Sequence, residues 1–124
     1  MFRRLNEELG SARILKCPSD REAIAHTNVN KVQNGNVSYF VNAELKEQRA
    51  SALLAGDRNL ETNGVAVPRG SRVALGMHLQ PGWTADLHKR QGNVLLGDGS
   101  VHMFKSETFP QALERLGTNV ILVP

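Results

Sequence analysis

The sequence has a single cysteine among its 124 residues and no long apolar run. Because a disulfide needs two cysteines, none can form within this chain, whichever compartment holds it. No window of eighteen apolar residues occurs, so the printed sequence contains neither a membrane-spanning helix nor the apolar part of a signal peptide. Aromatic residues make up only 5%, which predicts a modest, mainly aliphatic core.

The common catalytic and cofactor motifs are missing as well. The chain has no HExxH, P-loop, GxSxG elbow, CxxC pair or EF-hand loop, each of which places its reactive groups through a fixed spacing. We therefore expect no cofactor and no metal, and we expect that the protein is not an enzyme.

Turn-forming residues are plentiful, with eleven glycines and five prolines. They favour short strands joined by loops over a helical bundle. A chain of this length is the size of one domain, so we assign residues 1–124 to a single globular domain. The formal charge is +3, without a run of five basic residues, which predicts only a weak attraction to polyanions.

The most informative stretch is LHKRQGNVLLGDGSVHMFK, residues 87–105, which predicts a β-hairpin. Two apolar-rich runs flank Asp98-Gly99, a dipeptide that readily adopts the positive φ angles of a two-residue turn. Alternation puts Val101 and Met103 on one face of the second strand. A slip of one residue would exchange the buried and exposed faces.

The remaining pattern predicts short strands between two short helices. An apolar stripe through Phe2, Leu5, Leu9 and Ala12 predicts an N-terminal helix that Gly10 ends. A Thr108-x-x-Gln111 capping box predicts a late helix through residue 116. We expect short strands over residues 12–16, 37–41, 51–55 and 120–123, and an edge strand over 65–67. Asn34-Gly35 predicts a second hairpin, and Asn63-Gly64 predicts a turn. This order indicates an α+β fold with a mainly antiparallel β-sheet.

Titratable residues near the hairpin give the sharpest chemical hypothesis, a metal or acid–base site. The candidates are His88, Asp98, His102, Asp86 and His78. Along an extended strand His88 and Asp98 would lie about 15 Å apart, so they would not touch. We therefore expect Asp98 and Gly99 to set the turn, and His88 to anchor the incoming loop by a hydrogen bond to backbone or carboxylate.

Cys17 precedes a turn formed by Pro18, Ser19 and Asp20. We expect it to be a small, half-buried apolar residue, because a nucleophile or metal ligand would need a low thiolate pKa and suitable partners. We expect Ser19 or Asp20 to cap the backbone that follows.

The corner Gly56-Asp57-Arg58-Asn59 follows an apolar run. An adjacent Asp and Arg can anchor a carboxylate–guanidinium network. We expect a structural role, in which Asp57 accepts backbone N–H groups and Arg58 closes a loop. Trp83, ahead of the hairpin, is expected in the core.

Three ordered blocks resemble a known family. The spacing His-X9-Asp-Gly resembles the prepilin-type processing-associated domain of pseudopilin-like type II secretion proteins from Planctomycetes and Verrucomicrobia. ILKCPSD at 14–20, and VSYFVN and LLAGDRN at 37–42 and 53–59, are similar to that family's other blocks and occur in the same order. The residues of this motif set are His88, Asp98, Gly99, Cys17, Pro18, Asp20, Gly56, Asp57 and Arg58.

The resemblance implies a pilin-like head domain, which acts as a non-enzymatic assembly subunit of a pseudopilus. The implied partners are other pilin-like subunits and, for the full-length form, a prepilin peptidase. The implied location is the cell envelope, with the membrane reached only through an N-terminal apolar helix. We expect that helix and its leader to have been cut from this chain, with a natural relative lacking them as the alternative. No acidic cluster matches the calcium site of major pseudopilins, so none is carried over.

Two other functions remain open. A small binding module would use Lys89, Arg90 and Lys105 to reach the phosphates of a nucleic acid or other polyanion. A hydrolase would use Cys17 or His88. Salt-dependent retention on heparin would favour the first, and a hydrolysis rate unchanged by His88→Ala would count against the second.

Overall fold

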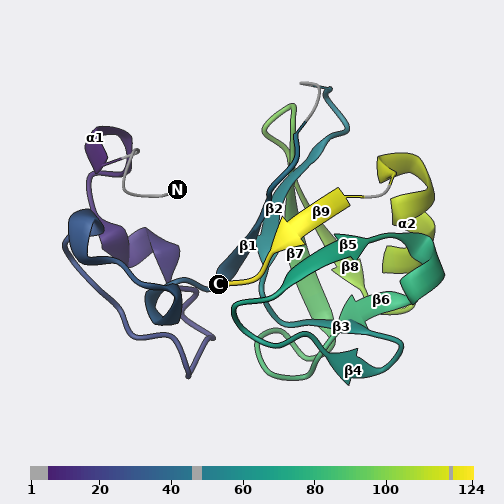
Figure 1. The fold of residues 1–124 in the computed structure, drawn as a ribbon, viewed down its shortest axis with the longest axis horizontal. Coiled ribbons are helices and arrows are strands. Elements are labelled where there is room, and N and C mark those ends of the chain that lie inside the picture. The colour runs from purple at the N-terminus through teal and green to yellow at the C-terminus, as the bar shows by residue number, and fades with distance from the viewer. Residues whose placement is uncertain (1–5, 46–48, 118) are drawn as a thin grey trace.

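The computed structural model of the chain describes residues 6–45, 49–117 and 119–124. Figure 1 shows an N-terminal segment of turns and short helices beside a body of strands and one longer helix. The helices are α1 (Asn6–Leu9), α2 (Phe109–Leu116) and the 3-10 helices Ala12–Leu15, Val29–Lys31, Asn34–Asn36 and Met77–Leu79. Within these ranges, every helix is too short or too polar to cross a bilayer.

The strands form two antiparallel sheets. They are β1 (Tyr39–Asn42), β2 (Leu53–Asp57), β3 (Leu60–Thr62), β4 (Val65–Ala66), β5 (Arg72–Leu75), β6 (Pro81–Trp83), β7 (Gln91–Leu96), β8 (Val101–Lys105) and β9 (Asn119–Leu122). The larger sheet has the order β5-β9-β1-β2-β7-β8 and the smaller one β4-β3-β6. The predicted α+β class with a mainly antiparallel sheet is confirmed, whereas the assignment of one domain stays a prediction.

One face of the larger sheet carries the main core. Phe40, Val94 and Ile121 project from β1, β7 and β9 and are fully buried. They pack with Trp83 of β6 and Phe109 of α2, whose ring centroids lie 4.7 Å apart. The prediction of a core role for Trp83 is confirmed.

The other face of this sheet is partly open. Register places the same-face residues of neighbouring strands side by side. The open face, as we name it, consists of Val41, Ala55, Leu95, Val101, Met103 and Leu122, all intermediate or exposed. The N-terminal segment has a second apolar cluster, which includes Leu15 and Val37, and Tyr39 of β1 packs against it.

The hairpin is present, but its loop is one residue longer than predicted. Leu95 pairs with Val101, and the Leu96 N–H donates to the Ser100 carbonyl at 2.9 Å, which leaves a three-residue loop. Gly99 has φ +84°, the left-handed conformation usual at the end of such loops. The extra residue puts Val101 and Met103 opposite Leu95 and Asn93, on the open face.

Helix α2 ends as predicted and begins differently. The N–H of Gly117, which has φ +74°, donates to the Leu113 carbonyl at 2.8 Å. The predicted capping box is wrong, because the Thr108 hydroxyl instead donates to the Lys105 carbonyl at 3.2 Å and caps no helical N–H.

Two predictions in the N-terminal segment are wrong. Residues 12–16 form no strand, because the Ser11 hydroxyl accepts the Arg13 N–H and starts a 3-10 turn there. Asn34-Gly35 forms no hairpin, because Asn36 accepts the Gln33 N–H and closes another 3-10 turn. Gly10 does end α1, with φ +62°, while the predicted helix start at residues 2–5 lies outside the described residues.

The other strand predictions hold with small shifts. Strand β1 begins two residues later than expected, and β2 runs two residues further, through Asp57. The turn at Asn63-Gly64 is confirmed by two positive φ angles, and β4 is an edge strand as predicted.

Candidate functional site

The three sequence blocks meet where the N-terminal segment lies against the sheet. Cys17 and Asp20 come from the turn after the first 3-10 helix, Asp57 and Arg58 from the end of β2, and His88 from the loop between β6 and β7. Cys17 and Asp20 of the first block contact His88 and Arg58 of the other two blocks. We call these five residues the block junction.

A buried ion pair forms one half of the junction. Arg58 Nε lies 2.7 Å from Asp20 Oδ2, and Arg58 Nη2 lies 2.6 Å from Asp20 Oδ1. The Asp20 side chain is fully buried and that of Arg58 is 8% exposed. Glu22 adds a third contact, 3.0 Å from Arg58 Nη2. This two-pronged geometry is the strongest form of the arginine–carboxylate pair.

The pair alters the ionisation of both partners. Burial alone would raise the pKa of Asp20, but hydrogen bonds from Arg58 and from the Ala23 N–H outweigh it and hold that pKa far below its ordinary value of 3.8. Burial would lower the pKa of Arg58, and the bond to Asp20 raises it instead. Both groups therefore remain charged at neutral pH.

Asp20 also shapes the turn in which it lies. Its Oδ1 accepts the N–H groups of Glu22 at 3.0 Å and Ala23 at 3.1 Å, which confirms the predicted capping role. Arg69, which the sequence analysis did not single out, lies 3.6 Å from Asp20 Oδ2. Its Nη1 donates to the carbonyls of Val37 and Pro124 and to that of Asn34, so it ties the chain's C-terminal end to the N-terminal segment.

The other half of the junction brings together a thiol, a carboxylate and an imidazole. His88 Nε2 lies 3.4 Å from Cys17 Sγ and 3.4 Å from Asp57 Oδ2. All three potential ligand atoms lie within 4.8 Å of one another. Cys17 is 5% exposed and Asp57 2%, whereas the His88 side chain is 27% exposed. Cys17 is thus more buried than predicted, and His88 does reach a carboxylate as predicted.

Sheet pairing fixes the Asp57 carboxylate. Asn93 of β7 donates to Asp57 Oδ2 from its backbone N–H at 2.7 Å and from its side-chain amide at 3.0 Å. Asp57 therefore accepts a backbone N–H as predicted, but from the neighbouring strand and not from its own turn. Asn93 belongs to the site and was missed, although it stands inside the hairpin block.

Asp98 lies in the hairpin loop and bonds to Ser100, whereas His88 contacts Cys17 and Asp57. Its Oδ1 accepts from the Ser100 N–H at 2.9 Å and the Ser100 hydroxyl at 2.6 Å, and these bonds lower the pKa of Asp98. The same hydroxyl lies 2.9 Å from His102 Nε2. The predicted turn-setting role of Asp98 and Gly99 is confirmed.

The remaining candidates contribute little to the junction. Asp86 bonds to the Thr84 hydroxyl at 3.1 Å, and Arg90 Nη2 lies 2.9 Å from Glu61. His78, Lys89, Lys105 and Pro18 are exposed. Gly56 is buried, and a Cβ there would lie 2.6 Å from the Phe40 ring.

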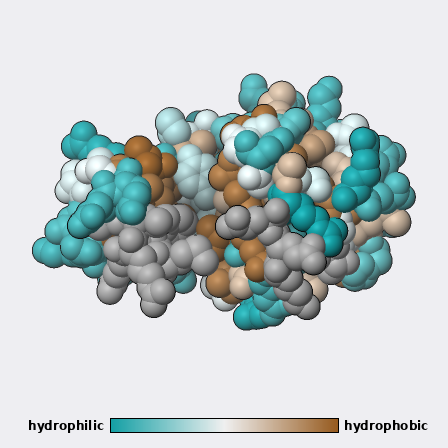
Figure 2. Space-filling model, turned by 90° about the horizontal axis from the view of Figure 1, so that it is seen from above, coloured by the Kyte–Doolittle hydropathy of each residue, from teal (hydrophilic) through white to brown (hydrophobic). Residues whose placement is uncertain are grey.

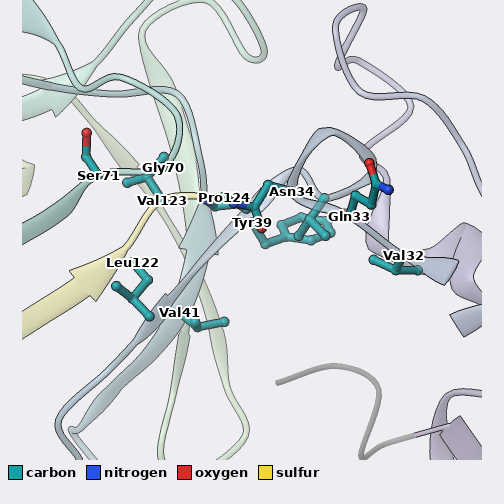
Figure 3. Close-up of a pocket in the computed structure, with 11 residues that line it drawn as sticks. Val32, Gln33, Asn34, Tyr39, Val41, Gly70, Ser71, Leu122, Val123 and Pro124 are labelled. Atoms are coloured by element: carbon teal, nitrogen blue, oxygen red, sulfur yellow. The ribbon is translucent and has the colours of Figure 1, made fainter. Parts of the chain in front are cut away.

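The open face is hollowed where it meets the N-terminal segment. A groove of about 270 Å³ is lined by Val32 and Gln33 on one side and by Tyr39, Val41 and Leu122 on the other (Figure 3). A second hollow continues across the sheet from Tyr39 to Val101. Figure 2 shows hydrophobic residues on both sides of the depression between the two parts of the molecule.

Comparisons with protein-family models, with curated proteins and with solved structures found no match. The chemistry of the junction is therefore argued from its geometry.

The junction does not have the geometry of a cysteine–histidine–aspartate triad. In such a triad one ring nitrogen of the histidine takes the proton of the nucleophile and the other donates to the carboxylate. Here Cys17 and Asp57 both face the same nitrogen, Nε2. This arrangement differs from that of a nucleophilic triad, and three donor atoms within 4.8 Å of one another can hold a metal ion.

Proposed function

We propose that this chain is the head domain of a pseudopilin-like assembly subunit that performs no catalysis. In this proposal the open face of the larger sheet packs against a neighbouring pilin-like subunit. The full-length form is processed by a prepilin peptidase and works in the cell envelope, anchored by an N-terminal apolar helix.

The observation that carries the proposal is the exposure of large apolar side chains on one sheet face. Val101 and Met103 are each 63% exposed, and Leu122 is 38% exposed. Val101 and Met103 lie on β8 and Leu122 lies on β9 of the same sheet, and no described element covers them. Contiguous apolar patches of this kind mark protein-interaction surfaces.

The junction supports the family resemblance on which the proposal rests. If the three blocks belong to one family motif, they should contact one another in the fold. Asp20 of the first block bonds to Arg58 of the second, and Cys17 of the first block lies beside His88 of the third. These contacts join residues 38 and 71 positions apart. A role in holding the head together suits a subunit whose work is assembly.

The proposal is tested on the protein in its source cells. The mature protein is recovered with an antibody raised against residues 1–124, and its N-terminus and intact mass are determined after separation of envelope and aqueous fractions. We expect an envelope protein in which a processed apolar segment of about twenty residues precedes residue 1. A protein that starts at residue 1 in the aqueous fraction would overturn the proposal.

A further inference from the structure

We propose that Cys17, Asp57 and His88 bind one zinc ion, which fastens the N-terminal segment to the sheet. The proposal departs from the sequence-based expectation of no metal, because these residues are scattered along the chain and only the fold brings them together. It does not depend on the assembly function, since the ligands lie at the block junction and not on the open face.

The two separations from His88 Nε2 fit tetrahedral zinc. Zinc binds sulfur at about 2.3 Å, imidazole nitrogen at about 2.0–2.1 Å and carboxylate oxygen at about 2.0–2.2 Å. At tetrahedral angles these bond lengths separate sulfur from nitrogen by about 3.5 Å and nitrogen from oxygen by about 3.4 Å. In the structure both separations from His88 Nε2, to Cys17 Sγ and to Asp57 Oδ2, are 3.4 Å.

The shared nitrogen is the second argument. A single imidazole nitrogen cannot accept a proton from the Cys17 thiol and donate one to the Asp57 carboxylate at the same time. A metal ion resolves this conflict, because an imidazole nitrogen, a thiolate and a carboxylate oxygen can each give it a lone pair. The two anionic ligands would also balance the charge of a divalent ion in a buried place.

The site has an orienting partner and a path for the ion. The two hydrogen bonds from Asn93 hold the Asp57 carboxylate in place, as outer hydrogen bonds do at many metal sites. Because the His88 side chain is 27% exposed, the ion can enter from solvent, and water can complete the four-coordinate shell. A thiolate with imidazole and one carboxylate favours zinc over magnesium or calcium, which prefer oxygen.

The first test is a titration of the reduced, metal-free protein with Co²⁺, followed by displacement with Zn²⁺. We expect one ion per chain, with the sulfur-to-cobalt charge-transfer absorption and the strong visible bands of a four-coordinate thiolate site. We expect Zn²⁺ to remove these bands and to protect Cys17 from a thiol reagent in the unaltered protein.

Variants assign the ligands. Cys17→Ser, His88→Gln and Asp57→Asn should each weaken Zn²⁺ binding at least about tenfold in calorimetry, and Asn93→Ala should weaken it about tenfold by releasing the carboxylate. His78→Gln, which alters an exposed histidine on the 3-10 helix Met77–Leu79, should bind Zn²⁺ as the unaltered protein does. Circular dichroism checks that each variant is folded.

Two results would overturn the proposal. One is the absence of the sulfur-to-cobalt band together with unprotected Cys17 at saturating Zn²⁺. The other is Zn²⁺ binding that survives Cys17→Ser and His88→Gln, or that His78→Gln removes. The Cys17 protection assay needs no variant, so a ligand substitution that fails to fold does not block the test.

Discussion

At the scale of single residues, the pair of Asp20 and Arg58 dominates the polar interior. Both side chains are almost wholly buried and meet through two hydrogen bonds. A buried pair adds little stability compared with an apolar pair, but the loss of one partner leaves the other charge buried and unmatched. The structure therefore depends on both being present.

We predict that Asp20→Asn lowers the free energy of unfolding by about 3 kcal/mol. The substitution keeps the shape of the side chain and removes the charge that faces Arg58. Urea unfolding of the two proteins measures the difference. Glu22→Gln is the matched control, because Glu22 contacts the same guanidinium but is 64% exposed, so its loss should cost less than about 1 kcal/mol. Equal costs for the two variants would contradict the assigned role of burial.

The same carboxylate should make stability depend on acid. Since the pKa of Asp20 is lower in the folded protein than its ordinary value of 3.8, its contribution is complete above about pH 4 and is lost as pH falls further. The stability difference between the unaltered protein and Asp20→Asn should thus shrink between pH 5 and the lowest pH at which both fold. We would measure it by urea unfolding in steps of pH, and a difference that stays constant would contradict the assignment.

Gly56 should tolerate no side chain. A Cβ there would lie 2.6 Å from the Phe40 ring and 2.8 Å from the Asn93 carbonyl, so the strands β1, β2 and β7 would have to move apart. We predict that Gly56→Ala costs about 1–3 kcal/mol, the usual cost of overpacking. Gly35→Ala is the control, because nothing lies within 4 Å of its Cβ position, and its melting temperature should be nearly unchanged.

At the scale of elements, the conformation of the hairpin loop depends on Gly99. Its φ of +84° is unfavourable for residues with a Cβ, and most of all for a β-branched one. We predict that Gly99→Val lowers the free energy of unfolding by about 1 kcal/mol or more, measured by thermal and urea unfolding. Gly99→Asn, which tolerates this conformation better, should recover part of the loss, and an unchanged melting temperature for Gly99→Val would contradict the loop assignment.

The elements also show what the sequence could predict. The hairpin, the late helix and the turn at residue 63 can be predicted from the sequence, because each is set by a local signal. That signal is a turn dipeptide or a glycine at the end of the element. The loop length was missed by one residue, since Asp98-Gly99 fits a two-residue or a three-residue loop. The strand expected at residues 12–16 is absent, because a five-residue stretch that mixes apolar and basic side chains is too short to show a decisive period.

Local sequence patterns cannot predict the block junction, because its contacts join residues that lie far apart in the sequence. Cys17 and His88 stand 71 residues apart, and Asp20 and Arg58 stand 38 apart. The sequence marked all four as candidates, but their pairing depends on how the N-terminal segment lies on the sheet. Arg69 has no distinguishing neighbours in the sequence. Asn93 stands inside the hairpin block, but only the fold shows that it donates to Asp57.

At the scale of the whole molecule, charge is spread and partly paired. Arg90 is one of the basic residues that the polyanion-binding hypothesis requires, and its guanidinium lies 2.9 Å from the Glu61 carboxylate. We predict that the protein passes through a heparin column at low salt. Retention that collapses at moderate salt would instead favour a phosphate-binding module, and Lys89→Ala with Lys105→Ala would then show whether the hairpin is responsible.

Photo-cross-linking in the source cells can show whether the open face contacts a neighbouring subunit, as the proposed function requires. A photoreactive residue replaces Val101, 63% exposed on β8, in the full-length protein. The control is the same replacement at Val65, 69% exposed on the smaller sheet. We predict cross-links from position 101 to a pilin-like subunit, identified by mass spectrometry, and few cross-links from position 65. Equal cross-linking at both positions, or none to a pilin-like subunit at position 101, would contradict it.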